Sequence, residues 1–143
     1  MRTSTKRWNG DVDGQLTADG IIDGVNYHID TRDCDTHDLG SHIVFSGTQI
    51  ISNEEYHHVS LYLPHNTTVG RYPIGAPSLQ IYATVSGEIA GTEYFYSAQT
   101  GEINVLSIDL ANSEVNANFH FKLEDSLTGE VKNGSFISTG PKK

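Results

Sequence analysis

The sequence contains very little cysteine and proline, with one Cys and four Pro among 143 residues. A lone thiol, Cys34, cannot form an intramolecular disulfide, which excludes the small secreted scaffolds that disulfides hold together. The chain also lacks an apolar run long enough for a membrane-spanning helix, and no apolar segment of a signal peptide follows Met1. We therefore expect a cytoplasmic protein as the sequence is written, and an exported one if a signal has been removed from its N-terminus.

Positive charge is scarce as well, because nine Lys and Arg stand against 18 Asp and Glu, for a formal net charge of -9. Phosphate binding needs clustered basic side chains, so this balance argues against nucleic acid as a partner. An acidic surface suits a basic protein partner or cations, or serves solubility alone. We therefore expect that any macromolecular partner is another protein. The sequence leaves the oligomeric state open.

The length and the apolar content predict one domain. A chain of 143 residues has the usual size of a single domain, and its hydrophobic fraction of 36% is enough for one core. We divide it into a polar N-terminal segment over residues 1–14, expected to be flexible, a single β-domain over 15–138 and a C-terminal tail over 139–143.

Apolar and polar residues alternate along several segments, most clearly over 56–63, 79–85 and 115–123. This period of two is typical of a β-strand with one buried face, and no segment has the 3.6-residue repeat of an amphipathic helix. In the first segment the alternation puts His57 on the same face as Leu61, which predicts a histidine in the core or at its boundary.

The connections between strands are predicted from turn residues and polar segments. Asp-Gly pairs at 13–14, 19–20 and 23–24 have the composition of tight hairpin turns. The polar segment 30–41 is predicted to be a loop, and residues 99–101 a hairpin turn.

Within Glu102–Leu110 the apolar face switches sides, which indicates a bulge or bend. About nine or ten short strands separated by turns predict an all-β fold. The architecture is either a single antiparallel β-sandwich or a lipocalin-like β-barrel.

A series of short motifs in the second half of the chain carries a family resemblance. The sequence places a Gly-x-Tyr-x-apolar-Gly turn first, then aromatic and Asn-containing strand segments, in the order 69–75, 94–97, 101–105, 118–121 and 133–136. Over Gly24 to Ser138 this order resembles a family of small bacterial β-domains of unknown function that often occur in exported lipoproteins. The resemblance implies a β-sandwich or a lipocalin-like barrel, and it implies no catalytic residues.

The densest group of potential metal ligands lies between Asp30 and His42. Carboxylate and imidazole side chains bind metal ions, although the spacing matches neither a zinc-finger pair nor an H-E-x-x-H helix, and an exposed, solvated loop has the same composition. Cys34 is flanked by carboxylates, which oppose its thiolate and so raise the pKa of the thiol. The candidate ligands of this segment are Asp33, Asp35, His37, Asp38 and His42.

Tyrosine supplies the candidate binding residues. Exposed tyrosines give a large contact area at low entropic cost, as protein-binding and sugar-binding surfaces require, and in a β-protein they also serve as a half-buried second face. Six of them lie in the middle of the chain: Tyr56, Tyr62, Tyr72, Tyr82, Tyr94 and Tyr96.

No nucleophile elbow, phosphate-binding loop or cofactor motif is present in the sequence. We therefore expect no cofactor and a non-enzymatic binding domain that presents an acidic, Tyr-bearing surface to a macromolecular partner, for instance as a bacterial inhibitor or immunity protein. The alternatives are a small-ligand or carbohydrate carrier that uses a barrel mouth, and a metal-dependent enzyme that uses the Asp30–His42 segment.

Overall fold

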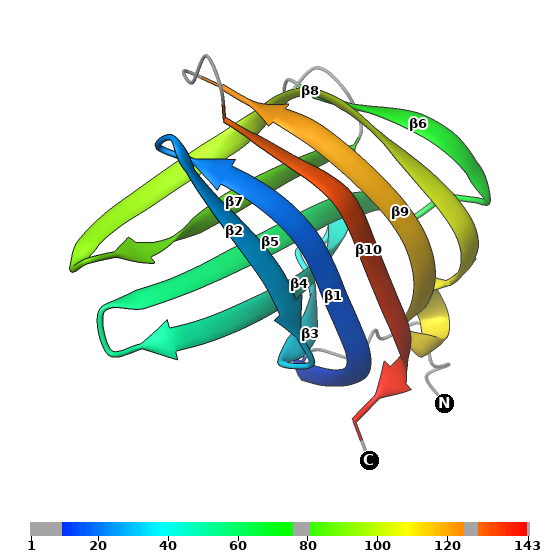
Figure 1. The fold of residues 1–143 in the computed structure, drawn as a ribbon. Coiled ribbons are helices and arrows are strands. Elements are labelled where there is room, and N and C mark those ends of the chain that lie inside the picture. The colour runs from blue at the N-terminus through cyan, green and yellow to red at the C-terminus, as the bar shows by residue number, and fades with distance from the viewer. Residues whose placement is uncertain (1–9, 76–80, 125–128, 143) are drawn as a thin grey trace.

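The structure is a computed structural model that describes residues 10–75, 81–124 and 129–142 (Figure 1). Within these residues the chain forms ten strands and one short 3-10 helix, η1. The elements are β1 (Gly10–Ile22), β2 (Val25–Thr31), β3 (Cys34–Asp38), β4 (His42–Ser52), β5 (Glu55–Pro64), β6 (Gly70–Gly75), β7 (Tyr82–Ile89), β8 (Thr92–Asp109), η1 (Leu110–Asn112), β9 (Glu114–Leu123) and β10 (Glu130–Pro141).

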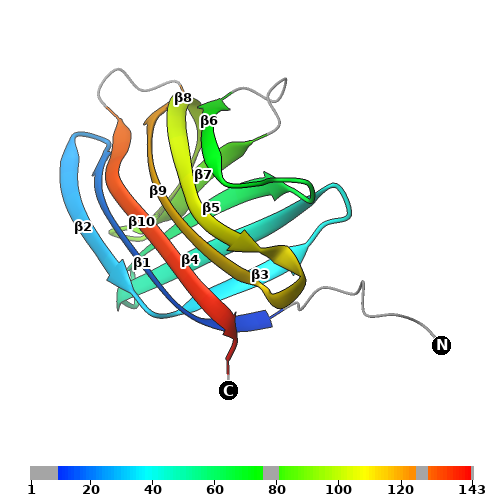
Figure 2. The same ribbon diagram turned by 90° about the vertical axis from the view of Figure 1, so that its right-hand side faces the viewer.

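The strands close into an antiparallel barrel, as the views in Figures 1 and 2 show. Pairing runs from β10 through β9, β8, β7, β5, β4 and β3 to β1, and β1 pairs in turn with β10. Eight of the described strands form this ring. The prediction of an all-β barrel is confirmed, and closure decides between the barrel and the sandwich, because a closed ring leaves no unpaired sheet edge.

Two strands, β2 and β6, lie outside the ring because the long strands β1 and β8 each have two partners on one side. The start of β1 pairs with β3, and its remainder pairs with β2. Likewise β8 pairs first with β7 and then with β6. Strand β2 therefore borders β4 without a ladder, and at Asp30 the backbone N–H donates to the side-chain Oε1 of Gln49 at 2.7 Å.

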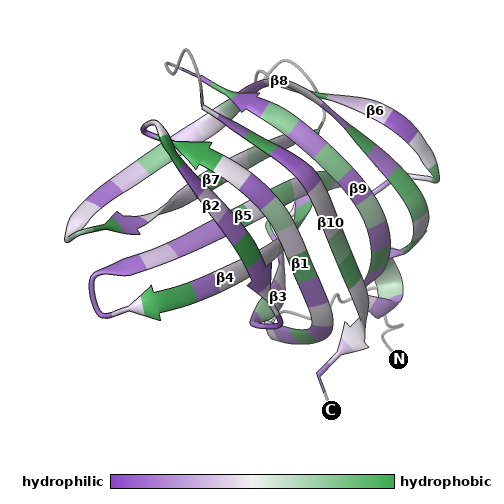
Figure 3. Cartoon of the chain, in the orientation of Figure 1, coloured by the Kyte–Doolittle hydropathy of each residue, from purple (hydrophilic) through white to green (hydrophobic). Residues whose placement is uncertain are grey.

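The core follows from the period-two pattern, which appears as alternating bands of hydropathy along the strands in Figure 3. In β9 the buried set runs from Val115 to Leu123 at every second residue. Across the barrel, Phe45 and Phe136 have no exposed surface, and their ring centroids lie 5.6 Å apart. We call the inward residues of this region the apolar half: Leu16, Phe45, Leu61, Leu63, Val105, Ala117 and Phe136.

Only one of the three predicted Asp-Gly turns forms. Asp23 and Gly24 have positive φ angles of 52° and 81° and connect Ile22 to its partner Val25, as a two-residue hairpin turn requires. The prediction was wrong for the pairs at 13–14 and 19–20, which lie inside β1. There, pairing on both sides of β1 outweighs the local turn preference.

The predicted hairpin turn at 99–101 is also wrong, because β8 continues through it. Its register shifts between Ala98 and Thr100, where the strand exchanges β7 for β6 as its partner. The bulge predicted within Glu102–Leu110 is confirmed, as a second register shift between Val105 and Ser107.

The predicted loop over 30–41 contains strand β3, so this prediction was wrong. Its polar residues pair on both sides, with β1 and β4, and Cys34 and Thr36 point into the core. Strand β1 begins at Gly10 and β10 ends at Pro141. Residues 1–9 and 143 of the expected terminal segments lie outside the described residues. In the part of the chain that the structure describes, no helix is long and apolar enough to cross a membrane.

Candidate functional site

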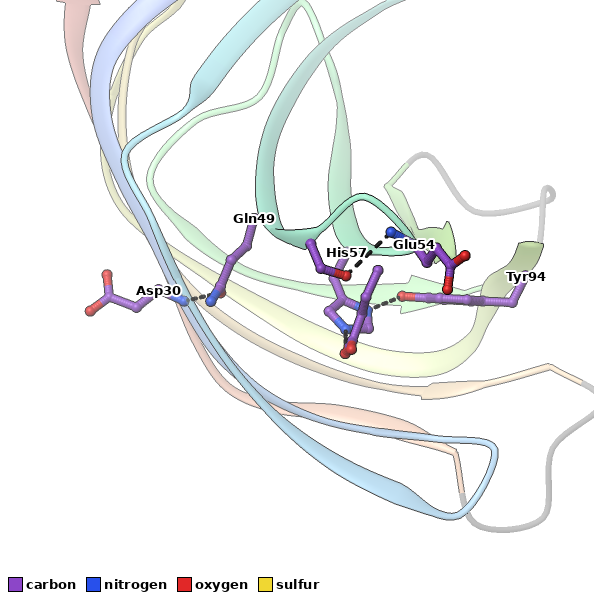
Figure 4. Close-up of polar contacts among 7 residues, drawn as sticks. Asp30, Gln49, Glu54, His57 and Tyr94 are labelled. Carbon is purple, nitrogen blue, oxygen red and sulfur yellow. Dashed lines mark hydrogen bonds and ion pairs between the residues drawn. The ribbon is translucent and has the colours of Figure 1, made fainter. Parts of the chain in front are cut away.

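The β1–β2, β4–β5 and β7–β8 turns lie on one side of the barrel, at the left of Figure 1, and we call this end the mouth. Two of these turns are joined directly, because the N–H of Gly91 donates to the carbonyl of Glu54 at 3.2 Å. Several inward-facing residues are polar here. Figure 4 shows Gln49, His57 and Tyr94 within the curve of the sheet. The mouth is thus an end of the barrel at which polar side chains join the interior.

His57 lies at the inner end of this polar group. The alternation of β5 turns it inward, as predicted, and only 1% of its surface is exposed. Its Nδ1 lies 2.6 Å from the Tyr94 hydroxyl, and its Nε2 lies 3.3 Å from Oε2 of Glu55 (Figure 4). Both ring nitrogens therefore have partners, as a buried imidazole requires.

The chemistry of Glu55 decides the direction of this chain of hydrogen bonds. An ionised carboxylate only accepts, so in the neutral imidazole Nε2 carries the proton and Nδ1 accepts. The Tyr94 O–H then donates to Nδ1. The Tyr94 hydroxyl hydrogen is therefore used in the hydrogen bond to His57. The lone pairs of the Tyr94 oxygen can still accept a hydrogen bond from another group.

Three tyrosines and His57 form a continuous row of rings, which we call the aromatic wall. Ring centroids are separated by 4.3 Å between Tyr27 and His57, 5.9 Å between His57 and Tyr94, and 6.0 Å between Tyr94 and Tyr96. These residues come from β2, β5 and β8, and the three tyrosines are half-buried against the core. Distant strands thus supply one surface.

Gly87 on β7 makes room for this wall. A Cβ at this position would lie 2.0 Å from the carbonyl oxygen of Tyr56 and 3.0 Å from Cε2 of Tyr94. Gly87 pairs with both His57 and Tyr94, so its missing side chain allows the two rings to approach across β7.

Two carboxylates complete the mouth and shape its electrostatics. The Tyr96 hydroxyl donates to Oδ1 of Asp23 in the β1–β2 turn, which ties that turn to β8. This hydrogen bond raises the pKa of Tyr96. Burial and then the charges of Glu55 and Asp23 raise the pKa of Tyr27, and burial is also the main cause of the raised pKa of Tyr94. The phenols are held protonated in a region of negative potential.

The six tyrosines predicted to bind do not share one surface. Tyr94 and Tyr96 belong to the aromatic wall, whereas Tyr62 and Tyr82 stack on the outer face with centroids 4.4 Å apart and an interplanar angle of 13°. The Tyr72 hydroxyl donates to the carbonyl of Thr68 at 2.9 Å. Tyr56 faces outward like Tyr62, as the alternation of β5 predicted.

The candidate metal ligands are not brought together. Asp35 and His37 lie on the outer face of β3, 3.8 Å apart, whereas Asp38 contacts His65 at 2.9 Å. Over residues 10–75, 81–124 and 129–142 there is no group of three His, Cys, Asp or Glu side chains that would hold a metal ion, and this includes Asp33 and His42. The alternating directions of a strand separate residues that a loop would have gathered.

Cys34 is buried and faces the core. Burial raises the pKa of its thiol to about 11, and the neighbouring Asp33 and Asp35 add to this shift. The predicted direction is therefore confirmed, although burial rather than the acidic neighbours is the main cause.

Sequence reasoning missed Asp23, Tyr27, Gln49 and Glu55 as parts of the mouth. The inward phase of His57 in an apolar face was the available signal. A buried imidazole needs two polar partners, but the sequence does not identify residues that are distant along the chain as those partners.

These features define the molecule as a closed β-barrel with a polar, aromatic mouth. Comparison of the chain with protein-family models, with curated proteins and with solved structures finds no match.

Proposed function

We propose that this protein is a non-enzymatic binding protein that holds a small ligand at the mouth of its barrel. The observation that carries the proposal is the aromatic wall, whose buried member His57 is hydrogen-bonded at both ring nitrogens. Half-buried rings with polar tips provide both apolar contact area and hydrogen bonding, which is the usual composition of a small-ligand site.

The position of the polar group supports binding rather than a purely structural role. A closed barrel gains most from an interior filled with apolar side chains, and buried polar groups contribute less than apolar packing of the same volume. The apolar half follows this rule, whereas the mouth departs from it at residues drawn from three strands. Such local departures are typical of functional sites.

The serine and histidine elsewhere on the barrel support binding without catalysis. Ser60 Oγ lies 3.0 Å from Nε2 of His58, as in a nucleophile and its base. However, Ser60 is only 3% exposed and also bonds Ser46 Oγ at 2.8 Å, so this pair is closed to a substrate.

A ligand screen by thermal shift and by NMR tests the proposal. A compound that binds the folded state raises the melting temperature by mass action, and a compound in the mouth perturbs the amide signals of β2, β5 and β8. Tyr94→Phe should weaken the effect, and Tyr62→Phe on the outer face is the matched control. Binders that perturb only the outer face would contradict the proposal.

The stacked pair Tyr62 and Tyr82 favours a second candidate function, the binding of another protein. His42 packs edge-on to Tyr82 with centroids 5.2 Å apart, which extends the aromatic surface across β4, β5 and β7. With a net charge of -9, such a face would suit a basic partner, as an inhibitor or immunity protein would need.

Affinity purification from cells tests this second candidate. A partner retained by the protein and by Tyr94→Phe, but lost with Tyr62→Ala, supports it. Retention by Tyr62→Ala as well would contradict a role for the outer tyrosines.

A further inference from the structure

We propose that the mouth selects a small organic cation, a protonated amine that carries an apolar group. This inference rests on the proposed function, because it names the chemical class of the ligand that the aromatic wall would hold. It follows from three properties of the same residues: the direction of their hydrogen bonds, the aromatic character of their half-buried rings and the sign of the nearby charges.

The hydrogen bonds leave acceptors facing the mouth. Tyr94 donates its proton to His57, and Tyr96 donates its proton to Asp23. Each phenol oxygen keeps lone pairs but has no proton left to donate. A ligand that meets these oxygens must therefore supply the hydrogens, and an ammonium group supplies up to three.

The rings favour a cation for a separate reason. An aromatic face carries partial negative charge, so a cation within about 6 Å of a ring centroid is attracted, and more strongly when it is desolvated. Tyr27, Tyr94 and Tyr96 contribute three such half-buried rings from two strands. The apolar part of the ligand would pack on the same rings.

The negative charges near the aromatic wall also favour a cationic ligand. Asp23 accepts a hydrogen bond from Tyr96, and Oε2 of Glu55 lies 3.3 Å from Nε2 of His57. Burial is the main cause of the raised pKa values of Tyr27 and Tyr94, and the charges of these two carboxylates add to it. A potential that disfavours a phenolate also disfavours an anionic ligand and attracts a cation. The net charge of -9 adds a weaker, long-range attraction.

Three probes of one shape test the inference: 2-phenylethylamine as the cation, 2-phenylethanol as the neutral analogue and 3-phenylpropanoate as the anion. Each is titrated into the protein near neutral pH while the NMR signals of mouth residues are followed. We expect the amine to bind at least about tenfold more tightly than the alcohol, which corresponds to about 1.4 kcal/mol, and the anion to bind most weakly.

Asp23→Asn isolates the contribution of charge. Asn tolerates the positive φ of this position, and its amide oxygen still accepts from Tyr96, so the turn and the hydrogen bond are kept. We expect a loss of about threefold or more in amine affinity, within the range of a charge interaction at a partly exposed site. The matched control is Glu114→Gln, an exposed carboxylate at the start of β9, at the opposite end of the barrel.

The outcomes separate the two proposals. Tighter binding of the amine that Asp23→Asn weakens and Glu114→Gln does not would support the inference. Equal or tighter binding of the alcohol or the anion at the mouth would overturn the inference and leave the mouth as a binding site. Failure of all three probes and of the wider screen to perturb the mouth would overturn the proposed function as well.

Discussion

The apolar half and the mouth of the barrel lie on the same strands and follow the same inward alternation, yet their side chains differ in kind. On β5, Leu61 is buried in the apolar half and His57 is buried at the mouth, four residues away. Leu61 needs only close packing, whereas His57 needs Tyr94 and Glu55 as partners. One strand can therefore serve as scaffold and as site, because burial places different demands on apolar and polar groups.

This difference also allows stability to be tested apart from the proposed ligand binding. In the apolar half the packing of Phe45 on Phe136 involves no polar atom of either ring. At the mouth the rings of Tyr94 and Tyr96 also carry hydroxyls that are hydrogen-bonded to His57 and Asp23. We expect variants of the apolar half to change the free energy of unfolding, and variants of the mouth to change mainly what is bound.

Phe136→Ala should have the largest effect on stability. The ring is fully buried, so its removal leaves a cavity, and we expect a loss of about 3–5 kcal/mol in the free energy of unfolding. Urea denaturation followed by circular dichroism measures this loss. A loss below about 1 kcal/mol would mean that the interior is not closely packed at this position.

Gly87→Ala should affect both the barrel scaffold and the mouth, because the added Cβ would lie against the backbone of Tyr56 and the ring of Tyr94. The added Cβ would overlap the carbonyl of Tyr56, so we expect a loss of about 1–3 kcal/mol and shifted signals of Tyr94. The matched control is Gly20→Ala, where the nearest atom, Cδ1 of Ile22, lies at an ordinary 3.6 Å. Equal losses of stability in the two variants would contradict the inference that the mouth needs a glycine at position 87.

Tyr94→Phe should cost less, because it keeps the ring and removes one hydroxyl. The substitution leaves Nδ1 of the buried His57 without its partner, and we expect a loss of about 1–2 kcal/mol. Tyr62→Phe is the control, and we expect it to cost at most a few tenths of a kcal/mol, as surface changes usually do. Thermal denaturation of both variants, with the wild type as reference, gives the comparison. Equal losses would contradict the hydrogen-bond chain from Tyr94 to His57.

The buried thiol of Cys34 tests whether the core is closed to reagents. Of the four predictions, this one involves the smallest change in stability at neutral pH. Its thiol pKa is raised to about 11 from 9.0, so the unfolded chain ionises first as the pH rises. The contribution of Cys34 to stability is fully present below about pH 9 and is lost as the pH passes through about 11. At pH 8 we expect native protein to react with a thiol reagent far more slowly than urea-unfolded protein. Rapid reaction of the native protein would contradict the burial of this side chain.

The sequence predicted the fold better than the site, for a physical reason. Period-two alternation is a local property, so β5 and β9 were evident along the chain, and the switch of phase in β8 revealed its bulge. Turn preference is also local, but pairing competes with it. For this reason the Asp-Gly pair at 19–20 became part of β1 and the expected turn at 99–101 became part of β8.

The candidate site was predicted only in part. Tyr94 and Tyr96 were among the predicted binding residues, and the inward direction of His57 was evident from its neighbours in β5. The prediction grouped six tyrosines because they are close in sequence, whereas the barrel divides them between its inside and its outer face.

The sequence by itself therefore determined the all-β class, the single core and the face on which His57 lies, because each depends on neighbours within one strand. Only the tertiary structure decided that the sheet closes, that β3 replaces a predicted loop, and that Tyr27, Glu55 and Asp23 meet the tyrosines of β8. Closure depends on the pairing of β1 with β10, which joins Val12 to Pro141, and the hydrogen bond from Tyr96 to Asp23 spans 73 residues. Such contacts form only when chain closure brings the segments together, and no local pattern encodes them.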